Sequence, residues 1–238
     1  MVISARNLDF KELNQTIRDT DEHVQIDDCC GQRFIGSGLK EKNLTVNGTP
    51  GNALGAYLGG GVITVHGNTQ DAVGDTMNDG TIIIHGHAGD ALGYAMRGGH
   101  IFVKENAGYR TGIHMKEYKD KKPVIVVGGA VGSFLGEYLA GGLIVVLGLG
   151  GDNTPVGNFT GTGMHGGSIF IRTKKEPDNL PAQVIATIAN ENNLKEIKPY
   201  IAAFAKYFGM DAAELINSRF YVLKPNAKNP YKQLYTAN

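Results

Sequence analysis

Short apolar segments recur along the chain at nearly constant spacing, and each ends at a sharp break. The segments are Leu44–Gly48, Ile63–Gly67, Ile82–Gly86, Ile101–Glu105, Val124–Gly128, Ile144–Gly148 and Ile169–Arg172. The first four begin 19 residues apart, and the later steps are 23, 20 and 25 residues. Apolar segments of this length, with alternating polarity in the early copies, are typical of strands. Their recurrence at this period indicates a solenoid in which each strand stacks on the next.

Two further features keep a fixed phase within the repeat. Glycine recurs seven residues after the end of each early segment, at Gly55, Gly74, Gly93 and Gly112, and Gly136 comes one place later in its coil. A long flexible apolar residue follows each glycine, at Leu58, Met77, Met96, Met115, Leu139 and, after an insertion, Met164. Coils stacked about 4.8 Å apart leave little space for side chains at tight corners, and such corners often need a positive φ. The glycines are therefore predicted at corners and the Leu/Met ladder in the interior.

The predicted fold is mainly β: a single-stranded right-handed β-helix of about seven coils over residues 44–173. Residues 1–43 are predicted to cap its open end, with an amphipathic helix at 7–18, a strand at 23–28 and a partial coil at 31–38. Glycine becomes scarce after residue 179, so residues 174–238 are predicted as a helical extension that packs on the β-helix. Its helices are expected at 181–192, at 194–208 ending before Gly209, and just after Asp211, followed by a strand at 220–223. A globular αβ domain with accidental glycines is the rival interpretation.

Outward-facing strand positions change character along the array. In the early coils they are polar: Thr45, Asn47, Thr64, His66 and His85. In the later coils they are apolar, and we assign Phe102, Ile125, Val127, Val145 and Leu147 to this face. Apolar residues on both faces of a strand indicate that something covers the outer one. The C-terminal helices are the favoured cover, and a contact with another subunit, including a second copy, is the alternative.

Charge and cysteine content exclude several classes of function. The 23 basic residues balance 23 acidic ones, which favours neither nucleic acid nor an anionic membrane as a partner. No apolar run approaches the roughly 20 residues of a membrane span, and a cytoplasmic location is expected. Cys29 and Cys30 are adjacent, so they are poorly placed to bond each other and cannot complete a structural zinc site.

The histidines are the strongest candidates for a metal site. His66 and His85 occupy the same phase of successive coils, with His87 close by, and stacked imidazoles can bind zinc. No carboxylate lies at a coordinating phase, and solvent-facing stacked rings explain the pattern without metal. We therefore predict no metal site, and a zinc-dependent enzyme using the His66/His85 ladder stays the alternative.

Two other patterns have non-catalytic explanations. Asn52, Asp71, Asp75 and Asp90 form a polar ladder that is expected to cap coil corners through bonds to the backbone. The glycine runs 128–132 and 149–152 could be phosphate loops, but no helix start and no following lysine accompany them. The prediction is therefore no catalytic, cofactor-binding or metal-binding residue in this chain.

The coils also resemble a known family. Residues 128–148 and 161–167 resemble the C-terminal β-helix (GXGXG) domain of the large (alpha) subunit of glutamate synthase, and the similarity spans about residues 28–173. A more distant similarity runs to the formylmethanofuran dehydrogenase subunit that has the same coils. The resemblance implies a structural module without catalytic residues. It would organise separately encoded amidotransferase and synthase subunits, and those subunits would carry the FMN and iron–sulfur clusters. A scaffold in a formylmethanofuran dehydrogenase-like redox complex is the rival that it leaves open.

Overall fold

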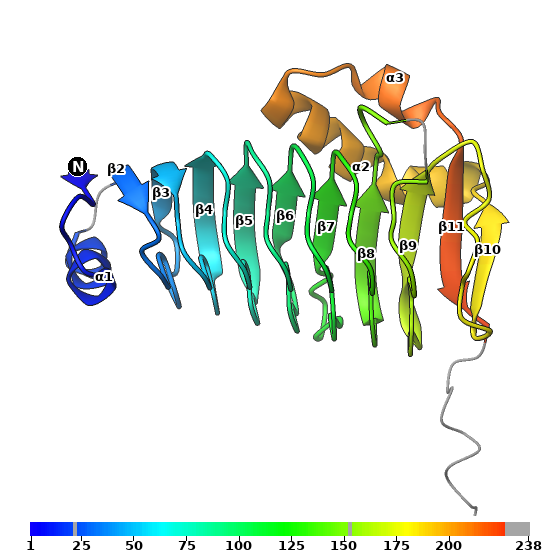
Figure 1. Ribbon diagram of the computed structural model, residues 1–238, viewed down its shortest axis with the longest axis horizontal. Helices are drawn as coiled ribbons and strands as arrows, with labels where there is room; N and C mark the ends of the chain where they lie inside the picture. Colours follow the sequence, from blue (N-terminus) through cyan, green and yellow to red (C-terminus); the bar gives the residue numbers. More distant parts are fainter. Residues whose placement is uncertain (21–22, 152–153, 227–238) are drawn as a thin grey trace, which may run out of the picture.

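The architecture is a β-helix built from one strand per turn (Figure 1). The computed structural model describes residues 1–20, 23–151 and 154–226. Within these residues, consecutive strands from β2 through β9 pair with one another in parallel. The strands are β2 (Val24–Cys30), β3 (Asn43–Thr49), β4 (Gly59–His66), β5 (Asp79–Ile84), β6 (His100–Val103), β7 (Val124–Val127), β8 (Ala140–Val146) and β9 (Gly166–Arg172). The predicted fold class is confirmed, and β2 adds one rung before the seven that the repeat predicted.

The interior is filled as the repeat predicted. Every member of the Leu/Met ladder is fully shielded from solvent: Leu58, Met77, Met96, Met115, Leu139 and Met164. Each phased glycine faces an isoleucine from a later strand. At Gly93, where φ is +67°, an added Cβ would lie 2.5 Å from Cδ1 of Ile125. Both the left-handed backbone and the isoleucine therefore require glycine at this position.

The register of β7 corrects one prediction. Ile101 pairs with Ile125, so the step is 24 residues, whereas Ile82 pairs with Ile101 after 19. Ile125 and Val127 consequently belong to the inner core, and their assignment to the outer face was wrong. The extra residues form a small excursion closed by backbone hydrogen bonds between Tyr118 and Lys121. Because side chains alternate along a strand, an error of one residue exchanges the two faces.

The segment after β9 corrects a second prediction. Residues 181–192 were predicted as a helix, but they contain strand β10 (Val184–Ile188), which pairs antiparallel with β11 (Phe220–Pro225). β11 in turn pairs antiparallel with β9, so the backbone edge of the last β-helix strand is covered. The β-branched residues Val184, Ile185 and Ile188 favour a strand at this place. The helix prediction gave more weight to Pro181 as a possible helix start.

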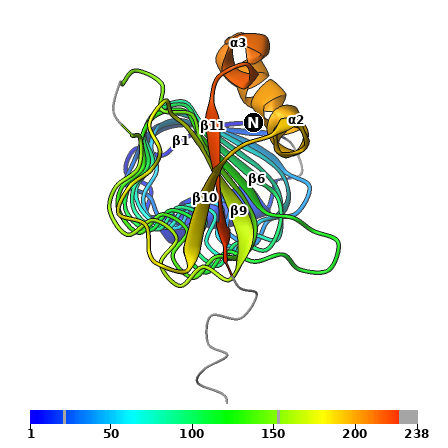
Figure 2. The same ribbon diagram turned by 90° about the vertical axis from the view of Figure 1, so that its right-hand side faces the viewer.

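The C-terminal helices lie along one side of the β-helix (Figure 2). α2 (Glu191–Phe208) begins at the Asn190 N-cap and ends at Gly209, whose φ of +68° is left-handed, and α3 (Ala212–Ile216) follows. Ile197, Ile201 and Phe204 of α2 are buried in one cluster with outward residues of β6 to β9. These outward residues include Phe102, Val126, Val145 and Phe170. Helix α2, rather than another subunit, therefore covers much of the apolar outer face.

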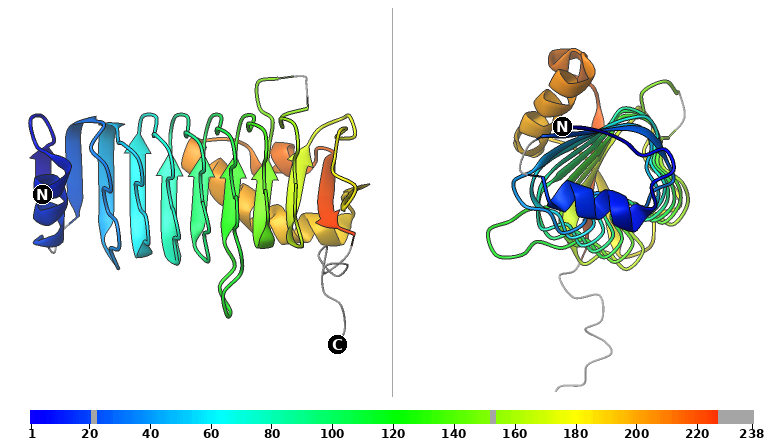
Figure 3. Two further views of the ribbon diagram at one scale, coloured as in Figure 1. Left: turned by 60° about the horizontal axis from the view of Figure 1, so that its bottom comes forward. Right: turned by 90° about the vertical axis from the view of Figure 1, so that its left-hand side faces the viewer.

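The N-terminal end is closed by β1 (Val2–Ser4) and α1 (Phe10–Arg18), which crosses the end of the coil (Figure 3). β1 pairs in parallel with β2. The sequence did not predict β1, which adds a further rung at this end. Leu13 and Ile17 of α1 are buried against the interior of the first coils.

Burial raises the pKa of the Cys29 thiol in β2 to about 11. None of the helices in the described residues has the length and apolar character to cross a membrane.

Candidate functional site

The histidine ladder is present and is covered at one end. The rings of His66 and His85 lie 4.7 Å apart, and Phe208 of α2 meets the ring of His85 edge-on at 5.2 Å. Burial lowers the pKa of His85, with smaller contributions from His66 and Lys104. His87 does not join the pair, because its Nδ1 accepts a hydrogen bond from the Asn106 N–H. Among the described residues, no group of three or more histidines, cysteines or carboxylates could hold a metal ion.

The polar ladder at the coil corners binds one coil to the next. The side-chain oxygen of Asn52 accepts the Asp71 N–H, that of Asp71 accepts the Asp90 N–H, and that of Asp90 accepts the Tyr109 N–H. Asp75 lies outside this series and accepts the hydroxyl of Thr76. The predicted corner capping is therefore observed for three of the four residues. These oxygens satisfy backbone donors that strands leave unpaired at each corner.

A second, parallel ladder of the same kind was missed. Asn68 accepts the His87 N–H, His87 accepts the Asn106 N–H, and Asn106 accepts the Ala130 N–H. Its members keep the 19-residue phase, so the repeat contained the signal. The mixture of Asn and His at one position obscured it.

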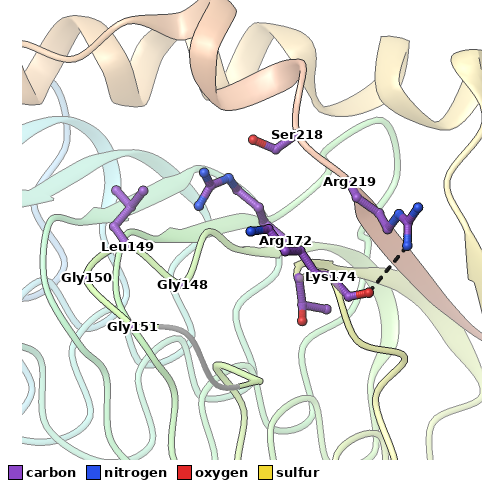
Figure 4. Close-up of a pocket in the computed structure, with 9 residues that line it drawn as sticks. Gly148, Leu149, Gly150, Gly151, Arg172, Lys174, Ser218 and Arg219 are labelled. Atoms are coloured by element: carbon purple, nitrogen blue, oxygen red, sulfur yellow. Dashed lines mark hydrogen bonds between the residues drawn. The ribbon is translucent and has the colours of Figure 1, made fainter.

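The two glycine runs have different environments. A Cβ at Gly128 or Gly129 would lie within 2.5 Å of atoms in the preceding coil, so this run packs between coils. Gly148–Gly151 instead lines a pocket of about 840 Å³ (Figure 4). Asp152, which was part of the predicted loop, lies outside the described residues. The pocket is also lined by Arg172, Thr173, Lys174, Ser218 and Arg219.

The cations of this pocket have few partners among the described residues. Nη1 of Arg172 donates to the Leu147 carbonyl at 3.1 Å, while its Nε is buried and has no acceptor among the described residues. Nη1 of Arg219 donates to the Lys174 carbonyl at 3.4 Å. Within the described chain, neither arginine nor Lys174 forms an ion pair with a carboxylate. Among the described residues that line the pocket, positive charge is therefore in excess.

Aromatic side chains and one arginine form two short series of contacts on the turns of the later coils, and all of them except the half-buried Phe134 are exposed. We call them together the aromatic row: Tyr94, His114 and Tyr138 in one series, and Arg110, Phe134 and Phe159 in the other. The His114 and Tyr138 rings are stacked 5.0 Å apart, and the Phe134 and Phe159 rings are stacked 5.1 Å apart. The guanidinium of Arg110 lies 5.0 Å from the centre of the Phe134 ring.

The aromatic row occupies unusual backbone positions. His114, Tyr138, Phe134 and Phe159 all have positive φ, between +53° and +63°. Such angles are uncommon for bulky residues and cost about 1 kcal/mol or more each. Tyr138 is 36% exposed and Phe159 is 55% exposed, so burial of their rings does not offset this cost.

Sequence reasoning missed the aromatic row although its phase was visible. Apart from Tyr94, its members lie two residues before or two residues after Gly112, Gly136 or Gly161, and Gly161 continues the corner series. In the early coils the first of these positions is Ala53, Ala72 or Ala91, and in later coils it becomes Arg110, Phe134 or Phe159. The change from alanine to large side chains at one phase was the available signal.

Comparison with known proteins agrees with the architecture. The GXGXG-motif family model matches residues 7–228. An uncharacterized protein of Methanocaldococcus jannaschii is 44% identical over an alignment of 251 residues, which covers 99% of this chain and 96% of the relative.

A solved structure with a similar fold is a chain of the formyltransferase/hydrolase complex (FhcABCD) of Methylorubrum extorquens, in complex with methylofuran. The TM-score is 0.62 and the sequence identity 21%, and the match covers 84% of this chain and 72% of that one. This likeness establishes the shared fold. With its coils, its phased glycines and the match over nearly its whole described length, the chain belongs to the GXGXG-motif family.

Proposed function

We propose that this chain is a non-catalytic structural subunit. It would organise separately encoded amidotransferase and FMN/iron–sulfur synthase subunits of a glutamate synthase-like complex. The observation that carries the proposal is the aromatic row, a set of mostly exposed aromatic side chains that lie with Arg110 on the turns of the coils. Tyrosine, phenylalanine and arginine are among the residue types enriched in protein interfaces.

The backbone supports a role in docking. The N–H groups of Arg110, His114, Phe134 and Tyr138 each donate to a carbonyl of the following coil, at 2.8–3.0 Å. The rings are therefore presented from positions fixed by the stacking of the coils. Pre-ordered side chains lose little conformational entropy when a partner covers them, which favours binding.

The second candidate is a scaffold in a different redox complex. The structural similarity to a chain of a formyltransferase/hydrolase complex supports it, because that neighbour is one component of a multi-subunit assembly. Both candidates assign the same physical role to this chain and differ in the subunits that it contacts. The identity of the partners therefore decides between them.

The test is purification of the tagged full chain from its native source, followed by identification of the proteins bound to it. Amidotransferase and FMN/iron–sulfur synthase subunits would support the first candidate, and formyltransferase-type subunits would support the second. The isolated chain should not hydrolyse glutamine. Turnover of glutamine by the isolated chain would contradict a non-catalytic role.

The aromatic row provides the matched variants. His114→Ala combined with Tyr138→Ala should weaken partner binding about tenfold or more, as loss of central interface residues does. Tyr57→Ala is the control, because Tyr57 has the same backbone position in an early coil (φ +58°) and is 58% exposed. Equal recovery of partners with both variants would refute the role of the aromatic row.

A further inference from the structure

Three segments that are distant in the sequence meet at the basic pocket. Gly148–Gly151 follows the carboxyl end of β8, Arg172–Lys174 lies at the carboxyl end of β9, and Ser218 and Arg219 precede β11 (Figure 4). The pairing of β9 with β11 fixes this arrangement, because Arg172 is opposite Phe220 and the Thr173 N–H donates to the Arg219 carbonyl. The pocket thus lies at the end of the sheet, where this pairing holds the three segments next to one another.

Side-chain donors in the pocket exceed the acceptors that the protein offers. An arginine has five N–H donors, and the described residues supply acceptors for only part of this capacity at Arg172 and Arg219. Figure 4 shows the Arg172 guanidinium in the space between Leu149 and Ser218, with the Arg219 guanidinium turned away from it. Buried donors without a protein acceptor are uncommon in folded proteins, and contact with a water or an ion is one recognised reason for them.

The glycine loop adds backbone donors. The Leu149 N–H donates to the Gly128 carbonyl, but the N–H groups of Gly150 and Gly151 have no acceptor in the described part of the chain. Gly150 has a φ of +84°, and, apart from the chain neighbours, no described residue has an atom within 4 Å of the Cβ position of Gly150 or Gly151. Successive free N–H groups in a loop of this kind bind anions, and phosphate oxygens in particular.

We propose that this pocket binds a small phosphorylated molecule with at least two negative charges. Arg172 and Lys174 would contact the phosphate groups from the end of β9, and the N–H groups of Gly150 and Gly151 would contact them from the loop. The volume of about 840 Å³ lies within the usual range of small-molecule sites and far exceeds one phosphate group. This proposal is independent of the scaffold role.

The first experiment is calorimetric titration of the purified full chain with pyrophosphate, and with citrate as a carboxylate of similar charge. We expect pyrophosphate to bind more tightly than citrate. Lys174→Gln should weaken pyrophosphate binding about tenfold, the usual effect of losing one charge-assisted hydrogen bond. Lys175→Gln is the matched control, because it removes the same charge from the neighbouring exposed residue, which does not line the pocket.

A second variant tests the loop without disturbing the fold. Gly151→Asp places a carboxylate in open space at a residue without a positive φ, so the protein should keep its stability and lose pyrophosphate binding. Three results would overturn the proposal: no pyrophosphate binding by the wild type, citrate binding more tightly than pyrophosphate, or equal weakening by Lys174→Gln and Lys175→Gln. None of these measurements involves a partner subunit, so their failure would leave the scaffold proposal intact.

Discussion

The contact between Gly93 and Ile125 offers a quantitative test of how the coils are held together. The Gly93→Ala variant places a methyl group 2.5 Å from Cδ1 of Ile125, which is closer than carbon atoms can approach. It also places alanine at a φ of +67°. The left-handed backbone costs about 1–2 kcal/mol, and overpacking of a dense core costs about 1–3 kcal/mol. Together they predict a loss of about 2–5 kcal/mol in the free energy of unfolding.

The two costs can be separated. Ile125→Val removes only Cδ1, and the next atoms near the added Cβ are Cγ1 of Ile125 at 3.5 Å and Sδ of Met96 at 3.6 Å, which are ordinary contacts. Ile125→Val alone should cost about 0.5–1.5 kcal/mol. In the Ile125→Val background, Gly93→Ala should cost only the backbone part. The coupling between the two substitutions is therefore predicted at about 1–3 kcal/mol.

The assay is urea unfolding of the wild type, both single variants and the double variant, with circular dichroism as the signal. Gly209→Ala is the control for the backbone part, since Gly209 has a φ of +68° and, its chain neighbours aside, no atom of the described residues lies within 4 Å of its Cβ position. Additive effects of the two substitutions would refute the contact. So would a Gly93→Ala variant that is no less stable than Gly209→Ala.

Three further predictions concern the core, the helical cover and pH. Met96→Asp should unfold the array, because a buried unpaired charge is highly unfavourable, and a wild-type melting temperature would contradict the interior ladder. Phe204→Ala should lower the free energy of unfolding by about 3–5 kcal/mol in urea titrations, and a loss below about 1 kcal/mol would contradict the packing of α2. Burial lowers the pKa of His85 and of His100, so below the ordinary value of 6.5 the unfolded chain binds more protons than the folded one. Stability should consequently fall as the pH decreases below 6.5, and equal urea midpoints at about pH 7.5 and about pH 5.5 would refute this.

Local repetition made the coils predictable. The Leu/Met ladder and the phased glycines recur because every coil packs against its neighbours in the same way, so the pattern of one coil identifies the others. The same comparison also contained the correct phase of β7. Gly136 comes one place late when the strand is taken to begin at Val124, and it is in phase when Ile125 is aligned with Ile101.

The C-terminal part was less predictable because its structure depends on remote partners. The start signal at Pro181 favoured a helix over residues 181–192, yet Val184–Ile188 pairs with a strand more than 30 residues away. Strand pairing between distant segments satisfies backbone groups that a local pattern cannot account for. The α2 helix, by contrast, was predicted nearly in place because its caps are local.

By itself, the sequence determined the β-helix, its Leu/Met ladder and one of its two series of corner bonds, because these follow from a short repeat and from the steric freedom of glycine. Tertiary structure alone decided the basic pocket, since Gly150, Arg172 and Arg219 come from three segments that only the β8–β9–β11 pairing brings together. It also decided that the aromatic row lies exposed, because exposure depends on where the rest of the chain packs. A repeat specifies how the coils stack, whereas a site depends on which residues remain accessible after the whole chain has packed.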